Sequence, residues 1–116
     1  MTPDELLSRL LYRDALMLVL DKPAGLPVHK GSGGGETLDD YVDTLRFGLP
    51  RAPALAHRLD RETSGCLVLG RHRKALDKLG KMFAASRIRK TYWAIVQGMP
   101  TENEGTIALP LVKQSA

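Results

Sequence analysis

The sequence has one cysteine, one tryptophan and two phenylalanines in 116 residues. A single cysteine cannot form an internal disulfide, which excludes a small fold held together by disulfide bonds. No apolar run approaches the roughly 18 residues that cross a bilayer. The N-terminus MTPDELLSRL also lacks the basic and then hydrophobic layout of a secretory signal. We therefore expect a cytoplasmic protein without a membrane-spanning segment.

The composition is that of a folded chain. Hydrophobic residues make up 43% and charged residues 26% of the sequence, close to the averages of globular proteins. No composition break or internal repeat marks a second domain, so residues 1–116 are expected to form one domain. The lone Cys66 lies in the apolar run GCLVLG, which predicts a buried and inert thiol.

The positive charge is concentrated in the second half of the chain. Residues 1–56 hold six Lys/Arg and eight Asp/Glu, whereas residues 57–116 hold eleven and five, so the net charges are −2 and +6. A positive face there suits a polyanion, most simply nucleic acid. On charge alone, an ordinary solvated helix face is slightly favoured. The basic residues in question are Arg71, Arg73, Lys74, Lys78, Lys81, Arg87, Arg89 and Lys90.

Helical and strand patterns alternate irregularly along the chain. Thr2 and Pro3 predict a helix start, with Leu6, Leu7, Leu10 and Leu11 as its apolar stripe. Thr37 predicts the start of an amphipathic helix that ends before Gly48 and Pro50. A further helix is expected over residues 72–86, and strands over residues 16–21, 65–71, 89–98 and 105–116. These elements predict a small α+β unit or part of a larger one.

The stretch HRLDRETSG, residues 57–65, is too polar for a core strand and has the character of a site. A free aspartate has a pKa near 3.9 and is ionised at neutral pH, and adjacent arginines favour the charged form. Asp60 is thus available as a nucleophile toward a sugar carbon, as carboxylates are in glycosidases. Charge reasoning alone favours a plainer role, in which Asp60 pairs with Arg58 or Arg61 and caps a turn.

Other chemistries find less support. The segment around Ser64 lacks the glycine two places before the serine of a nucleophile elbow. The three histidines are far apart in sequence, with no pattern typical of a metal site, and His72 is expected at the start of a surface helix. Residues 31–36 match no phosphate-binding loop. Tyr92 and Trp93 should point to opposite faces of a strand, where either ring could stack on a nucleobase or simply pack in a sheet.

Three segments together resemble a known family. LVLDKPAGLPVH, AHRLDRETSGCLVLGR and RKTYWAIVQG are similar, in that order and spacing, to the motifs of the RluA family of pseudouridine synthases. The resemblance runs from about Leu11 to the C-terminus. It implies a mixed, largely antiparallel sheet flanked by helices, and isomerisation of uridine to pseudouridine in ribosomal or transfer RNA.

The resemblance also implies roles for individual residues. Asp60 would be the nucleophile, Arg58 would help to hold the flipped-out nucleotide's place, and Tyr92 would stack on the target uracil. It implies no cofactor and no metal. The basic residues Lys74, Lys78, Lys81 and Arg89 would contact RNA phosphates without reading sequence.

Family members continue with a further motif, Gly-Arg-x-His-Gln-x-Arg-x-His, whose arginine is expected to pair with the catalytic aspartate. Residues 1–116 are therefore expected to be the first part of a catalytic domain. Two alternatives stay open beside the synthase: a noncatalytic RNA-binding remnant of such an enzyme, and a nucleoside- or sugar-active enzyme built around Asp60.

Overall fold

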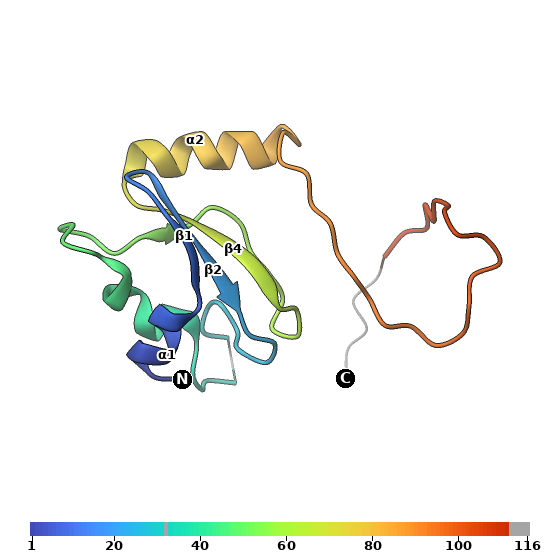
Figure 1. Cartoon of the computed structure of the whole chain (residues 1–116), viewed down its shortest axis with the longest axis horizontal. Coiled ribbons are helices and arrows are strands. Elements are labelled where there is room, and N and C mark those ends of the chain that lie inside the picture. The colour runs from blue at the N-terminus through green and yellow to red at the C-terminus, as the bar shows by residue number, and fades with distance from the viewer. Residues whose placement is uncertain (32, 112–116) are drawn as a thin grey trace.

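The computed structural model describes residues 1–31 and 33–111. Its centre is a four-stranded antiparallel sheet in the order β1-β2-β4-β3 (Figure 1). The strands are β1 (Leu10–Arg13), β2 (Met17–Lys22), β3 (Ala54–Leu55) and β4 (Gly65–Gly70). They are accompanied by helices α1 (Pro3–Ser8) and α2 (Arg73–Ala84) and the 3-10 helix η1 (Leu38–Leu45). The predicted α+β class, with an antiparallel sheet flanked by helices, is confirmed.

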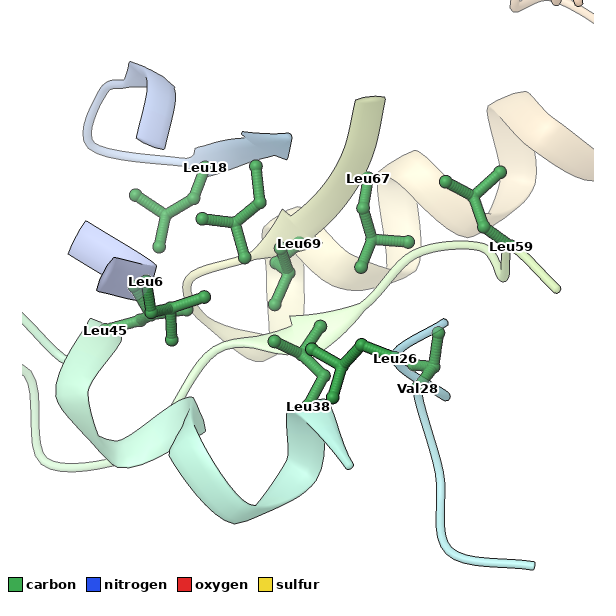
Figure 2. Packing of buried hydrophobic residues seen from close by; sticks show 10 residues of the cluster. Leu6, Leu18, Leu26, Val28, Leu38, Leu45, Leu59, Leu67 and Leu69 are labelled. Atoms are coloured by element: carbon green, nitrogen blue, oxygen red, sulfur yellow. The ribbon is translucent and has the colours of Figure 1, made fainter. Parts of the chain in front are cut away.

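The central pair β2–β4 carries the core. Leu18 lies opposite Leu69 and Leu20 opposite Leu67, and all four side chains are buried. Because strand side chains alternate between faces, every second residue of each strand points the same way. Leucines from α1, η1 and the connecting loops pack against this face, as Figure 2 shows. The predicted strands over residues 16–21 and 65–71 are thus confirmed, within one residue at each end.

The predicted first helix is correct at its start and too long at its end. The Thr2 side chain accepts a hydrogen bond from the Glu5 amide at 3.2 Å, as an N-cap residue does. The helix ends at Ser8, and Leu10 and Leu11 belong to β1, which pairs with β2. Leucines at helical spacing fit a longer helix equally well, but pairing with β2 satisfies the backbone of this segment instead.

The helix predicted after Thr37 forms as the 3-10 helix η1, which buries Leu38 and Leu45. Its first turn is attached to the loop that follows β2, because the Leu38 amide donates to the Pro27 carbonyl at 2.9 Å. The Asp40 carboxylate accepts from the Thr37 amide at 3.0 Å, as the acidic residue of a capping box does. This packing closes one side of the core.

No helix among the described residues is long and apolar enough to cross a membrane.

Helix α2 confirms the helix predicted over residues 72–86, and His72 caps its start by accepting the Ala75 amide at 3.2 Å. The helix lies very close to β4 at Gly70, where an added Cβ atom would come within 2.7 Å of the Leu76 Cα atom. Gly70 is therefore required for this contact.

Replacing Gly70 by alanine is expected to destabilise the fold by about 1–3 kcal/mol, because the backbone of α2 must move away from β4. The matched control is Gly80→Ala within α2, where an added Cβ atom meets nothing within 4 Å. That change is expected to stabilise by about 0.5–1 kcal/mol, since alanine favours the helix. Urea unfolding of both variants measures the two effects, and equal signs would contradict this account of Gly70.

The chain after α2 leaves the sheet as an extended arm, residues 87–111, drawn in orange to red in Figure 1. The strand predicted over residues 89–98 is wrong, and residues 105–111 form no strand either. Residues 112–116 of that last prediction lie outside the described residues. The arm carries eight exposed large hydrophobic side chains, namely Tyr92, Trp93, Ile95, Val96, Met99, Ile107, Leu109 and Leu111.

The prediction of a buried Cys66 is also wrong, because the thiol is exposed. The run GCLVLG forms β4 as expected, but only the face that carries Leu67 and Leu69 is covered by core residues. Cys66 points to the other face. A continuous apolar run predicts burial on both faces of a strand, and here only one face is buried.

Candidate functional site

The connection from β3 to β4, residues 56–64, presents Asp60 at the surface; we call it the Asp60 loop. Leu59 is buried, while its neighbours Arg58 and Asp60 are both exposed. Leu59 belongs to the same buried cluster as Leu67 of β4 (Figure 2). The backbone turns directly after the aspartate, where the Thr63 amide donates to the Asp60 carbonyl at 3.0 Å. One buried leucine thus fixes the loop, and the carboxylate faces solvent.

A second anchor comes from the buried lysine at the end of β2. Lys22 is only 1% exposed, and its ammonium group donates to the carbonyls of Pro23 and Leu26 at 2.8 Å each and of Arg61 at 3.2 Å. The Arg61 carbonyl also accepts from the Gly25 amide at 2.7 Å. Three acceptors match the three N–H donors of a protonated lysine. Lys22 therefore ties the residue that follows Asp60 to the Lys-Pro-Ala-Gly turn.

The charge around Asp60 differs from the expected pattern. Arg61 pairs with Glu62 through Nε and Oε1 at 2.6 Å, and within the described residues neither Arg58 nor Arg61 forms an ion pair with Asp60. The predicted arginine pair is therefore wrong here. Burial lowers the pKa of the Lys22 ammonium, and the negative charges of Glu62 and Asp60 oppose that lowering. Lys22 is thus a buried cation whose pKa reflects both carboxylates, although neither lies at ion-pair distance from its ammonium group.

A third anchor is His57, at the beginning of the loop. Its Nε2 accepts the Val68 amide of β4 at 3.0 Å, and its ring stacks on Phe83 of α2 with centroids 4.5 Å apart. Burial lowers the pKa of the His57 imidazole, the nearby charge of Lys90 lowers it further, and the Arg58 backbone raises it to a lesser extent. The ring is uncharged at neutral pH and joins the loop to both β4 and α2.

An open groove of about 780 Å³ lies beside the loop. It is lined by His57, Leu59 and the end of the Asp60 loop, by residues of β4, and by Phe83 with residues 88–94 of the arm. Tyr92 is among the lining residues and is 59% exposed, so its ring has room for a stacking partner. The structure therefore brings Tyr92 close to residues 62–66, but Asp60 itself does not line the groove.

The predicted phosphate contacts lie on α2 and the arm. Lys74, Lys78 and Lys81 follow one another at intervals of four and three residues on α2, which places them along one face. All three are exposed, and so is Arg89 on the arm, next to the groove. Together these four residues form what we call the basic surface.

Sequence reasoning assigned no role to Lys22 or His57. The signal for Lys22 was present, since alternation along β2 puts it on the same face as Leu18 and Leu20. A lysine on a core face needs acceptors, and the turn after β2 supplies two of the three. His57 gave no such signal, because its partners Val68 and Phe83 come from two other elements.

The chain is similar in sequence to RNA pseudouridine synthases. The chain is 47% identical over 111 residues to an uncharacterized RNA pseudouridine synthase of Zymomonas mobilis, covering 96% of this chain and 51% of that protein. It is 39% identical over 108 residues to the ribosomal large subunit pseudouridine synthase C of Buchnera aphidicola, covering 93% of this chain and 34% of that protein. The chain thus spans about half or less of the length of these relatives.

The fold has a counterpart among solved structures. Human RNA pseudouridylate synthase domain containing 4 superposes with a TM-score of 0.64 at 29% identity, over 73% of this chain and 33% of that one. The family model described as RNA pseudouridylate synthase matches residues 16–116, which include Lys22, the Asp60 loop and Tyr92. The chain belongs to the RNA pseudouridylate synthase family.

Proposed function

We propose that this chain isomerises uridine to pseudouridine within RNA, with the carboxylate of Asp60 as nucleophile. The observation that carries the proposal is an exposed carboxylate on a loop whose neighbouring residues are anchored by Leu59, Lys22 and His57. A reacting group must be accessible and also held in place, since misplacement by about 1 Å can cost 100-fold in rate. The Asp60 loop meets both requirements.

The proposed reaction begins at the Asp60 carboxylate. As the Asp60 carboxylate bonds to C1′ of the ribose, the bond between N1 and C1′ breaks and uracil leaves with the electron pair. The base turns, C5 bonds to C1′, and the carboxylate departs. C5 then loses its proton and N1 gains one, so that the product is an isomer of the substrate. No electron acceptor or donor is consumed.

RNA is the proposed partner, and Tyr92 the proposed stacking platform. A target base must leave its helix at a cost of a few kcal/mol, and stacking on an aromatic ring offsets part of that cost. The exposed ring of Tyr92 beside the groove suits this role. Arg58, two residues before the nucleophile and exposed, would hold the place of the flipped-out nucleotide. The name of the Buchnera relative makes large-subunit ribosomal RNA the first substrate to test, before transfer RNA.

Tritium release tests the proposal directly. RNA carrying tritium at C5 of uridine loses the label to water when C5 becomes bonded to ribose, and RNA binding alone releases none. Incubation of the full chain with labelled ribosomal and transfer RNA is expected to release tritium from at least one of them. Binding without release from either RNA would reject the synthase for this chain and support a noncatalytic RNA-binding module. Release from free uridine alone would support a nucleoside-active enzyme instead.

The noncatalytic alternative has two observations in its favour. Within residues 1–31 and 33–111, Asp60 has no cationic partner at ion-pair distance, and it lies outside the groove that Tyr92 lines. A binding module would use the basic surface and Tyr92 without chemistry at Asp60. Both functions include RNA binding, but only the synthase releases tritium. The tritium measurement therefore separates them.

The basic surface makes its own prediction. Neutralising Lys74, Lys78 and Lys81 together with alanine should weaken binding of every RNA alike, and should reduce the slope of log affinity against log salt by about 2–3. Filter binding at several salt concentrations measures this. The matched control is Lys30→Ala, which should leave the slope unchanged. Lys30 is an exposed lysine on the loop before η1 and pairs with Asp40. An unchanged slope in the triple variant would place the RNA elsewhere.

A further inference from the structure

The side chain of His57 occupies a position along β4 that backbone groups would otherwise fill. The Ala56 amide donates to the Val68 carbonyl at 3.0 Å, and the Val68 amide in turn donates to Nε2 of His57 at 3.0 Å. Both hydrogen-bonding groups of Val68 on this edge are thus satisfied by the first two residues of the Asp60 loop. The imidazole replaces a strand partner just where β3 stops pairing with β4.

The same ring also contacts α2. It stacks on Phe83 with an interplanar angle of 23°, and Lys90 of the arm lies over the Phe83 ring at 5.4 Å from its centroid. One side chain therefore joins the Asp60 loop, β4 and α2, three residues before the nucleophile. The buried Leu59 lies between His57 and Asp60, so displacement of the imidazole would be transmitted along a short stretch of backbone.

This contact exists only with an uncharged imidazole. To accept the Val68 amide, Nε2 must keep its lone pair, and the ring proton must then be on Nδ1. A protonated ring would direct a second N–H group at the Val68 amide and lose the bond. We propose that His57 is a positioning residue that holds the Asp60 loop in its working geometry while uncharged, and that its protonation switches off the isomerisation proposed above.

The charged and titratable groups around His57 agree with an uncharged ring. The Asp60 loop contributes Arg58 beside it and Glu62, which lines the same groove; β4 contributes Cys66, and the arm contributes Arg89, Lys90 and Tyr92. From α2 the group in contact is Phe83, which does not ionise. Burial and the positive charge of Lys90 both lower the pKa of His57, so the surroundings disfavour an imidazolium.

The direction of the pH effect follows from the lowered pKa of His57. Free imidazole has a pKa of about 6.5, so the unfolded chain binds this proton more readily than the folded chain. The stability that the uncharged contact contributes is fully present above about pH 6.5 and is lost as the pH falls through the folded pKa. Turnover that depends on the contact should fall over the same range.

Two substitutions separate positioning from simple stability. His57→Gln keeps an acceptor near the position of Nε2 and cannot titrate, so kcat should stay within about threefold at pH 7.5 and the fall in kcat below about pH 6.5 should disappear. His57→Phe keeps the stack on Phe83 but leaves the Val68 amide unpaired, so kcat should drop about 10- to 100-fold. KM for RNA should change less than kcat in both variants, because the phosphate contacts of the basic surface remain.

The control is His72→Gln. His72 also accepts a backbone amide, that of Ala75 at the start of α2, but it lies outside the groove. Its replacement should leave the acid side of the pH profile as in the wild type. Circular dichroism of each variant shows whether it is folded. Should His57→Phe fail to fold, the pH profile of His57→Gln still decides, because persistence of the acid fall in that variant would overturn the proposal.

An NMR titration of the imidazole nitrogens tests the contact between His57 and the Val68 amide without measuring activity. The expected spectrum shows the tautomer with the proton on Nδ1 and a His57 titration below that of free imidazole. A proton on Nε2 at neutral pH, or a His57 titration at or above pH 6.5, would refute the contact. The catalytic consequence rests on the proposed function: absence of tritium release by the wild type would remove that function, while the NMR result would still test the positioning contact.

Discussion

Replacing Asp60 by asparagine is expected to abolish tritium release, with a loss of at least about 10⁴-fold, as when a nucleophile is removed from other enzymes. Asparagine has the same shape but cannot supply a negatively charged oxygen to C1′. The side chain is exposed and its carboxylate makes no ion pair within the described residues, so the fold should stay within about 0.5 kcal/mol of the wild type. RNA affinity should remain equal or rise slightly, since a negative charge is removed from a basic region.

The control for this change is Asp4→Asn, the same replacement at an exposed aspartate in the first turn of α1. It should leave tritium release unaltered. Measurement of release, RNA affinity and urea unfolding on both variants separates loss of chemistry from loss of binding or folding. Turnover by Asp60→Asn within tenfold of the wild type would show that another group attacks the ribose, or that the reaction needs no nucleophile on the protein.

The second large effect is expected from Lys22→Met, a destabilisation of about 2–4 kcal/mol. Methionine fills much of the same volume but leaves the carbonyls of Pro23 and Leu26 without a donor from this side chain. Each buried polar group that loses its partner costs about 1–3 kcal/mol, and relief from burying a charge offsets part of the sum. Urea unfolding measures this loss as a lower midpoint at unchanged slope.

Lys30→Met is the matched control for Lys22. Lys30 is 63% exposed on its side chain and forms an ion pair with Asp40 at 3.6 Å, a contact of the kind that contributes little in water. Its replacement should change stability by less than about 0.5 kcal/mol. Lys22→Met should also reduce tritium release by more than unfolding explains, since the Arg61 carbonyl then keeps only the Gly25 amide. Equal stability of the two variants would refute the anchoring role of Lys22.

Periodicity was sufficient where a segment packs on its own neighbours or shows a clear apolar face. The β2 and β4 strands are short apolar runs bounded by turn residues, and α2 has apolar residues at helical spacing, so each could be predicted. The end of the first helix could not be predicted in this way. Leu10 and Leu11 suit a helix and a strand alike, and what decides is pairing with β2, which depends on residues elsewhere in the chain.

In the arm, a strand was predicted where none forms. Residues 91–96, Thr-Tyr-Trp-Ala-Ile-Val, have the composition of a strand, but in the described structure their backbone pairs with no other strand. Strand preference expresses packing and pairing rather than a property of the residues themselves. The sequence pattern therefore shows a preference for strand, but these residues form no strand in the described structure.

At the site, the resemblance to a family implied that Asp60 is a nucleophile, whereas charge reasoning alone favoured a turn-capping role. The structure gives the Asp60 side chain an exposed position. The expected partner, an arginine beside it in sequence, was wrong because Arg61 turns to Glu62. The buried lysine and the histidine that hold the loop act through carbonyl and amide groups of other segments, and such contacts leave no trace in local sequence.

The pairing of β2 with β4 has a consequence for the order of folding events. Lys22 lies opposite Gly65, so the ends of the loop that this pair closes are 43 positions apart in the chain. Closing so long a connection costs chain entropy before the contacts that offset this cost have formed. Strand pairs of this kind therefore form late and slowly during folding. The surroundings of Asp60 therefore cannot form as a local nucleus. They form only when the two central strands, β2 and β4, have paired.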